Sequence, residues 1–147
     1  MIIRRANQSD ASNITDFNAR LAHETERLTL DRAKLEAGVH AALSDSRKST
    51  YFLAEIGGKV AGQLMITHQW SDWRNGDIWW IQSVYVAAEF RRRGVFKALY
   101  EHVRQNARAS GAVGLRLYVE RENRGAQRTY ENLGMLLTSY LVMEEIL

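Results

Sequence analysis

Four cationic side chains are concentrated in residues 91–97, which read Arg-Arg-Arg-Gly-Val-Phe-Lys. The segment follows an apolar run at residues 78–86 that predicts a buried strand, and it leads into a helix expected over residues 94–109. Cations are unfavourable at a helix N-terminus, because the unpaired backbone N–H groups there carry partial positive charge. A phosphate or pyrophosphate bound by those N–H groups would offset the excess of positive charge. A solvent-exposed basic loop explains the same residues equally well, so both interpretations stay open.

The standard motifs for binding nucleotide phosphates are absent from the chain. No G-x-G-x-x-G occurs, which argues against a dinucleotide-binding fold, and Gly94 is not followed by the Lys-Ser/Thr pair of a nucleotide triphosphatase loop. The arrangement that remains is a loop with a single glycine that surrounds a pyrophosphate with successive backbone amides.

The composition limits the classes of protein to which the chain can belong. With 147 residues, 46% hydrophobic and 25% charged, it is typical of one globular domain, which we expect to span residues 1–147. The absence of cysteine excludes thiol catalysis and thiolate metal ligands, and the four histidines lack the spacing of a metal site. A net charge of +3 is too small to imply nucleic acid by itself. Without a signal peptide or an apolar run of about 20 residues, we expect a cytoplasmic protein that does not contact membranes.

The order of strands and helices indicates which elements would position residues 91–97. Apolar and β-branched runs predict six strands, at residues 2–5, 51–56, 60–67, 78–86, 114–119 and 135–144. Helical spacing and end signals predict helices from residue 9 or 10, over residues 31–43, over 94–109 and over 124–133. The strand, helix and strand at residues 78–119 form a βαβ unit, whose two strands must be parallel. We therefore predict an α/β fold (mixed α+β) with a central mixed sheet of about six strands.

The basic segment also resembles a known family signature. Residues 91–96 are similar to the acyl-CoA motif Gln/Arg-x-x-Gly-x-Gly/Ala of the GNAT superfamily of N-acyltransferases, and they follow a strand that ends in Val-Tyr-Val at residues 84–86. The similarity continues in the family's order through Leu-Tyr-Val at 117–119, Asn123, Ala126, Tyr130 and Asn-Leu-Gly-Met at 132–135. It covers residues 78–135, whereas the N-terminal half shares only the order of its elements. Phe96 departs from the pattern, but its backbone amide can still bind a pyrophosphate if the ring points away from the ligand.

This resemblance implies a fold, a reaction and a set of site residues. The GNAT fold has helices on both faces of its sheet, and the reaction would move acetyl from acetyl-CoA to a primary amine. We expect direct transfer, because no cysteine can carry the acetyl group. The residues implied for binding acetyl-CoA are Val84, Tyr85, Val86, Arg91, Arg92, Arg93, Gly94, Val95, Phe96, Lys97, Asn123, Ala126 and Tyr130.

Individual roles follow from the same resemblance. The main chain of residues 84–86 would pair with the pantetheine arm, and Asn123 would contact that arm or the adenosine. Tyr130 would be the catalytic residue, because a phenol of pKa ~10 can protonate the departing thiolate, whose conjugate thiol has a pKa near 8.5. Simpler roles remain: Asn123 suits a helix cap, and Tyr130 shares a helix face with Ala126 and Leu133, as core residues do.

No general base can be identified from the sequence. Some family members have a glutamate in the buried strand, but residues 81–84 contain no carboxylate here. Deprotonation of the amine can proceed through ordered water that Gln82 or Ser83 holds by hydrogen bonds. The other candidates are Asp72, Asp77, Glu24 and His68.

The four tryptophans all lie within residues 70–80, interleaved with Asp72, Arg74 and Asp77. An aromatic and acidic wall of this kind would suit a cationic amine, through cation–π attraction. Packing inside a hairpin, or a homodimer contact, explains the tryptophans equally simply; packing is favoured for Trp79 and Trp80. The acceptor can be a small molecule or a protein amine. Two non-catalytic alternatives are a GNAT-like acyl-CoA sensor and a basic RNA-binding domain, and the second would need aromatic side chains among the arginines.

Overall fold

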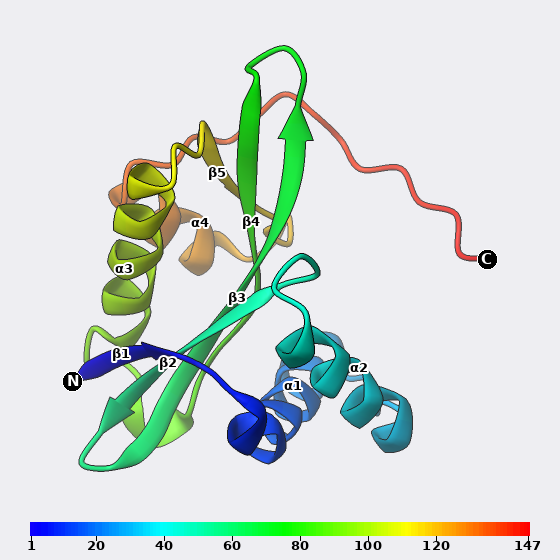
Figure 1. The fold of residues 1–147 in the computed structure, drawn as a ribbon, viewed down its shortest axis with the longest axis vertical. Coiled ribbons are helices and arrows are strands. Elements are labelled where there is room, and N and C mark those ends of the chain that lie inside the picture. Colours follow the sequence, from blue (N-terminus) through cyan, green and yellow to red (C-terminus); the bar gives the residue numbers. More distant parts are fainter. The chain divides into compact units, whose positions relative to one another are not determined.

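The computed structural model describes all 147 residues, which fall into two compact units, residues 1–117 and residues 118–147. The first unit contains one sheet of five strands in the order β1-β2-β3-β4-β5. The strands are β1 (Ile2–Arg5), β2 (Thr50–Ile56), β3 (Lys59–Ser71), β4 (Gly76–Val86) and β5 (Gly114–Leu117). The helices are α1 (Ala11–Glu26), α2 (Arg32–Ser44) and α3 (Val95–Ala109) (Figure 1). Only β4 and β5 are parallel, so the predicted mixed sheet and its βαβ unit are confirmed, with five strands instead of about six.

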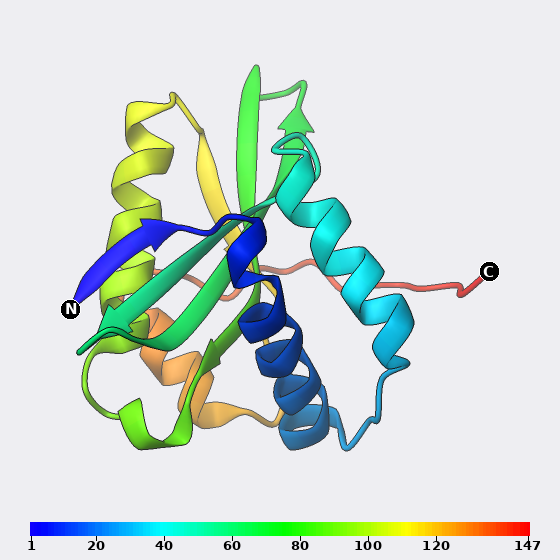
Figure 2. The same cartoon turned by 60° about the horizontal axis from the view of Figure 1, so that its bottom comes forward.

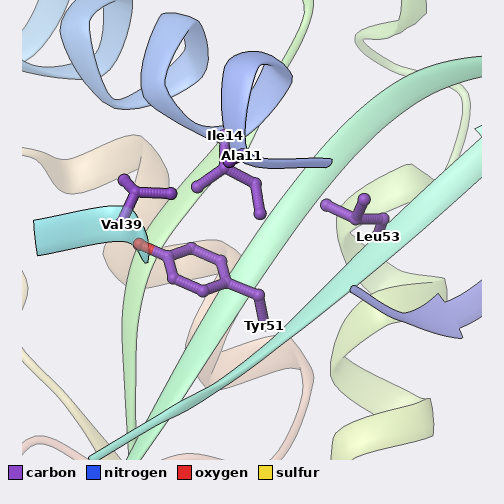
Figure 3. Close-up of a cluster of buried hydrophobic side chains, with 5 residues drawn as sticks. All are labelled: Ala11, Ile14, Val39, Tyr51 and Leu53. Carbon is purple, nitrogen blue, oxygen red and sulfur yellow. The ribbon is translucent and has the colours of Figure 1, made fainter. Parts of the chain in front are cut away.

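Helices cover both faces of the sheet, as Figure 2 shows for α3 on one side and for α1 and α2 on the other. The side chains of β2 show how both faces are used, because successive side chains of a strand point to opposite faces of the sheet. Tyr51 and Leu53 are buried against Ala11 and Ile14 of α1 and Val39 of α2 (Figure 3). Phe52, which lies between them, instead makes an edge-to-face contact with the ring of His102 of α3, with the ring centroids 5.1 Å apart.

Gly62 of β3 brings the start of α3 close to the end of β4. A Cβ atom at this position would lie 2.9 Å from the carbonyl oxygen of Tyr85 and 2.9 Å from a methyl carbon of Val95. Any larger residue would therefore push α3 away from the sheet or distort β4. The basic segment and the end of the buried strand are held together by this close approach.

The second unit contains α4 (Arg124–Asn132), which confirms the helix predicted at residues 124–133. Asn123 caps it by accepting a hydrogen bond of 3.0 Å from the backbone N–H of Ala126. After Gly134 the chain has no regular structure, so the strand predicted at residues 135–144 is wrong. The residues there favour a strand by type, but a strand also needs a hydrogen-bonding partner, which a sequence pattern does not supply. Among all the helices, none has the length and apolar character that crossing a membrane requires.

Candidate functional site

Strand β4 has an open edge at its C-terminal end. Its pairing with β5 covers only Ile78–Ile81, whereas β4 itself continues to Val86. On that side, residues 82–86 therefore present backbone N–H and C=O groups to no strand of the sheet. An extended ligand that contains amide groups can add to such an edge as another strand would. Val84, Tyr85 and Val86, the residues expected to bind pantetheine, all lie in this open part of β4.

A β-bulge shapes the same stretch. Gln63 pairs with Tyr85 and Met65 pairs with Gln82, so two residues of β4, Ser83 and Val84, oppose one residue of β3. The backbone of Ser83 has a φ of +49°, which lies in the left-handed region that residues other than glycine rarely adopt. Bulges turn a strand and redirect its backbone groups, and they are frequent beside functional sites.

The fully buried side chain of Gln63 holds this bulge. Its amide Nε2 donates hydrogen bonds to the carbonyl oxygen of Ser83, at 3.1 Å, and to Oδ1 of Asn18, at 2.7 Å. Asn18 in turn donates to the hydroxyl of Tyr51, at 3.1 Å. We did not identify Gln63 as a site residue from the sequence. The available signal was a glutamine in the middle of an apolar strand, which must find buried partners.

The N-terminus of α3 begins directly after the triple arginine. Gly94 is its N-cap residue, with a φ of +76°, and no side chain caps the helix there. A Cβ atom added to Gly94 would have no atom within 4 Å, so the space in front of the loop is open. The backbone of Arg92 is also in the left-handed conformation, with a φ of +58°. Uncapped backbone N–H groups beside open space suit an anion, and this is the site that a pyrophosphate of acetyl-CoA would require.

Arg91 braces the loop against β4 and α1. Its Nε donates to the carbonyl oxygen of Val86 at 3.0 Å, and its Nη2 forms an ion pair of 2.6 Å with Glu24. The guanidinium also lies over the ring of Tyr85, 5.6 Å from its centroid, and the Tyr85 hydroxyl donates to the second carboxylate oxygen of Glu24 at 2.8 Å. Of the three arginines, Arg91 is therefore the one already neutralised by a carboxylate.

The remaining cations of the segment form no ion pairs. Arg92 and Lys97 are exposed, and Arg93 lies with its guanidinium 5.4 Å from the ring centroid of Phe90. The ring of Phe96 contacts Tyr100, one turn further along α3, with centroids 6.1 Å apart. Charge that an anion can use is thus present on three side chains of the loop.

The environment of Glu24 makes it a poor general base. Hydrogen bonds from Tyr85 and Arg91 hold the pKa of the Glu24 carboxyl below its usual value, while burial and the bond to Glu24 raise the pKa of Tyr85. A carboxylate stabilised in this way has little affinity for a proton from an amine. The Glu24 side chain instead holds Tyr85 and Arg91 in place.

The other candidate bases lie on β3, on β4 and in the turn between the two strands. Gln82 donates from Nε2 to the Thr67 hydroxyl at 2.6 Å. His68 has its Nδ1 4.0 Å from an Asp77 oxygen, and Asp72 accepts a bond from the backbone N–H that follows it. Of these four residues only Gln82 lies in the open part of β4, whereas His68, Asp72 and Asp77 lie toward the hairpin with β3.

The tryptophans separate into two groups by exposure. Trp79 is buried and stacks at right angles on His68, as the packing interpretation predicts, and Trp80 donates from its indole N–H to Gln69 at 2.6 Å. Trp70 and Trp73 are 61% and 88% exposed. The second group is available to a ligand or partner.

In the second unit, α4 carries Ala126 and Tyr130, and Asn123 precedes it. The backbone carbonyl of Tyr130 accepts bonds from Leu133 and Met135 that close the helix. Burial raises the pKa of the Tyr130 hydroxyl above its ordinary value, so the phenol keeps its proton at neutral pH. No group of three or more His, Asp or Glu side chains could hold a metal ion.

Comparison with known proteins decides the family. The model of the acetyltransferase (GNAT) family matches residues 14–135, which is most of the chain. The chain belongs to the GNAT family. The resemblance inferred from residues 78–135 is thereby confirmed, and the GNAT match extends into the N-terminal half, where only the order of elements had been similar.

Solved structures agree with the GNAT assignment. A possible acetyltransferase from Clostridium difficile 630 is 44% identical, with a TM-score of 0.93 over 99% of this chain and 97% of that chain. A predicted acetyltransferase with acetyl-CoA from Clostridium acetobutylicum is 15% identical, with a TM-score of 0.80 over 98% and 95% of the two chains. AAC(6')-Iy in complex with the bisubstrate analog CoA-S-monomethyl-acetylneamine is 19% identical, with a TM-score of 0.82 over 99% and 97%. No curated protein matches the chain.

Proposed function

We propose that this GNAT protein transfers an acetyl group from acetyl-CoA directly to a primary amine. The observation that carries the proposal is the open edge of β4 at residues 82–86 beside the uncapped N-terminus of α3. Pantetheine contains amide groups that pair with a strand edge, and CoA contains a pyrophosphate that suits a helix N-terminus. Two structural neighbours add support, since one is described with acetyl-CoA and AAC(6')-Iy with an analog that joins CoA to an amine acceptor.

Binding is assigned mainly to backbone groups. Val84, Tyr85 and Val86 would bind the pantetheine arm, and the N–H groups of residues 93–97 would bind the pyrophosphate. Arg92, Arg93 and Lys97 would add charge-assisted contacts, whereas Arg91 would keep its place between Glu24 and the Val86 carbonyl. Asn123 and Ala126 would contact the cofactor from the second unit, so the proposal treats residues 1–147 as one acetyltransferase domain.

The chemistry needs one proton acceptor and one proton donor. A neutral amine forms the new C–N bond, the C–S bond of the thioester breaks, and the thiolate takes a proton from Tyr130. The amine loses its extra proton to water held near Gln82 or Ser83, and the Tyr130 phenolate recovers a proton from solvent. Because the pKa of Tyr130 is raised, the proton is best transferred as the C–S bond breaks, when the sulfur becomes basic.

A thiol-release assay tests this function. Purified protein is mixed with acetyl-CoA and a panel of amines: a polyamine, an amino sugar, an amino acid, a peptide with a free N-terminus and a lysine peptide. We expect release of CoA that depends on one class of amine, with the acetylated product identified by mass spectrometry. Tight acetyl-CoA binding by calorimetry without turnover on any amine would instead support the acyl-CoA sensor. Absence of acetyl-CoA binding would contradict both.

A further inference from the structure

An open cavity of about 620 Å³ lies between the sheet and the C-terminal half of α3. Apolar side chains from four strands form its floor: Ile3 of β1, Phe52 of β2, Ile66 of β3 and Trp79 of β4. His102 of α3 lines the helix side. The volume lies within the range of about 300–1,000 Å³ that is usual for sites of small molecules.

The register of the sheet explains why polar side chains reach the same cavity. Arg5 of β1 pairs with Phe52, and His68 of β3 pairs with Trp79. Cross-strand partners lie on the same face of a sheet. The contact between Phe52 and His102 shows that this face is the one that α3 covers (Figure 2). One arginine and two imidazole rings are therefore brought beside an aromatic floor by residues far apart in the sequence.

The cavity carries positive charge that no carboxylate neutralises. Neither Asp nor Glu is among the residues that line it. Of its two arginines, Arg4 is held by Asp10 and Glu55, each at 2.7 Å. Arg5 is exposed and forms no ion pair. A guanidinium can bind a carboxylate through two parallel hydrogen bonds, so Arg5 suits a ligand with one negative charge.

Uncharged donors lie around the same space. The hydroxyls of Ser46 and Thr50 line the cavity and form no hydrogen bond within the chain. His68 contacts Trp79 edge to face, and its Nδ1 lies 4.0 Å from Asp77, so its Nε2 remains for a ligand. Hydroxyl groups and imidazole N–H groups both donate to carboxylate oxygens. These donors can satisfy an anionic group that lies beside Arg5.

We propose that this cavity binds a small aromatic carboxylate, with its ring on Phe52 and Trp79 and its carboxylate on Arg5. Aromatic rings attract one another in edge-to-face and offset arrangements, which favours a ring over an aliphatic chain on this floor. A single unpaired arginine balances one negative charge. A phosphate monoester carries nearly two negative charges at neutral pH, so part of its charge would stay uncompensated here.

The cavity is separate from the site proposed for acetyl-CoA. His102, Asn106 and Ser110 line it near the C-terminal end of α3, whereas Gly94 caps the other end of this helix. At a rise of about 1.5 Å per residue, these three residues lie about 12–24 Å from Gly94 along the helix axis. The inference therefore does not depend on the proposed function, and a ligand in the cavity leaves the open edge of β4 free.

Backbone amide NMR of the protein, titrated with phenylacetate, tests where such a ligand binds. Shifts should concentrate at Arg5, Thr50, His68 and His102. They should saturate with one dissociation constant in the millimolar range or tighter, as expected for a ligand of this size. The amides of residues 82–97 should keep their positions.

A neutral ligand of the same shape, phenylacetamide, tests the role of charge. It should bind the wild type about five- to tenfold more weakly than phenylacetate, because it lacks the charge-assisted contact. Arg5→Gln should lower the affinity for phenylacetate by a similar factor and leave that for phenylacetamide unchanged. Arg20→Gln, at an exposed arginine of α1 on the other face of the sheet, is the matched control and should change neither affinity.

Three results would overturn the inference. If phenylacetate shifts no amide at the cavity, in a protein whose spectrum is that of a folded chain, no aromatic carboxylate binds there. Shifts confined to residues 82–97 would place the ligand in the site proposed for acetyl-CoA. Equal binding of phenylacetamide, or tighter binding of phenyl phosphate that also depends on Arg5, would assign the cavity to a neutral or a phosphorylated ligand.

Discussion

The two ends of strand β4 offer a ligand different kinds of chemical group. At the end that leads into α3, which we call the β4–α3 junction (residues 82–97), backbone groups are available while Arg91, Tyr85 and Glu24 are occupied with one another. At the other end, the hairpin end (residues 68–77), the backbone is paired between β3 and β4. There it is the side chains of Trp70 and Trp73 that are exposed.

This difference indicates which partner each end can recognise. A site made of backbone amides needs only a particular path of the chain, so it suits a cofactor that many proteins of a family share. In a site made of exposed side chains, each substitution changes the groups offered to the ligand, so such a site suits a partner that differs from one member of a family to the next. The proposed cofactor site therefore rests on the fold and a few residues of this chain, and the proposed acceptor site rests on its particular side chains.

The largest effect is expected at Tyr130, which neither end of β4 contains. Tyr130→Phe keeps the ring and removes only the hydroxyl, so the turnover number should fall about 10²–10⁴-fold if Tyr130 is the general acid. Acetyl-CoA affinity should hardly change, because one hydroxyl contact contributes only ~1 kcal/mol. Steady-state kinetics and calorimetry measure the two quantities. If Tyr130→Phe has the turnover number of the wild type, and chemistry is shown to be rate-limiting, Tyr130 is not the general acid and only packs.

The second prediction tests the backbone character of the junction. Gly94→Val places a β-branched residue at a φ of +76°, where strain costs about 1–3 kcal/mol and the loop must change its path. Acetyl-CoA affinity should fall about 5–150-fold, the ratio to which that energy corresponds. Calorimetry measures the loss.

Gly111→Val is a matched control, because Gly111 has the same φ of +76° just beyond the other end of α3 and also faces open space. It should destabilise the protein to a similar degree and leave acetyl-CoA affinity intact. Equal losses of affinity in both variants would show that strain alone, not the position of the glycine, causes the effect.

Much of the fold could be predicted because its signals are local. The N-cap of α2 at Asp31 and the single glycine before α3 each act within a few residues, and the helices predicted over residues 31–43 and 94–109 start at these two positions. The parallel pairing of β4 and β5 followed from one intervening helix. The missing sixth strand is different, since the type of residue in a segment does not say whether a partner edge is present in the same chain.

The site could be predicted only in part, for a related reason. Residues 84–97 were recognisable because they are contiguous. The contacts that hold them are not: Gln63 and Asn18 are 45 residues apart, and Arg91 and Glu24 are 67 apart. Such pairs leave no periodic pattern in the sequence, so their roles become visible only when the sheet brings them together.

The third prediction concerns the support behind the junction. Gln63→Leu keeps similar bulk but removes the donor for both the Ser83 carbonyl and Asn18. Each buried acceptor left unpaired should cost about 1–3 kcal/mol of unfolding free energy. The bulge should also relax, which raises the KM for acetyl-CoA. Urea unfolding and kinetics on Gln105→Leu, a change at an exposed glutamine of α3, provide the comparison and should show little change in either quantity.

The fourth prediction concerns the hairpin end. If Asp72 and Asp77 help to select a cationic acceptor, Asp72→Asn and Asp77→Asn should raise the acceptor KM about two- to fivefold, the range for exposed charge contacts, and less at high salt. The KM for acetyl-CoA should not change. Asp16→Asn on α1 removes the same charge from another element and is the control. An unchanged acceptor KM in both hairpin variants would show that Asp72 and Asp77 do not take part in binding the acceptor.

The smallest effect on turnover is expected at Glu24, where the junction uses a carboxylate as a brace. Glu24→Gln should leave the turnover number within about twofold, because a carboxylate that holds two donors is not the general base; loss of a general base would lower turnover about 10²–10⁴-fold.

The stability of the folded protein should reveal the role of Glu24 instead. The pKa of Glu24 is lowered in the folded protein, so its contribution is complete above the ordinary glutamate pKa of about 4.3 and is lost as the pH falls through the lower, folded-state value. Because the Glu24 side chain is 44% exposed, that contribution should be only about 0.2–1 kcal/mol. The wild type should therefore be slightly more stable than Glu24→Gln at pH 7, and urea titrations at decreasing pH should show the two proteins converging below pH ~4. A difference that stays constant into strong acid would mean that Glu24 stabilises the junction by packing, with no help from its charge.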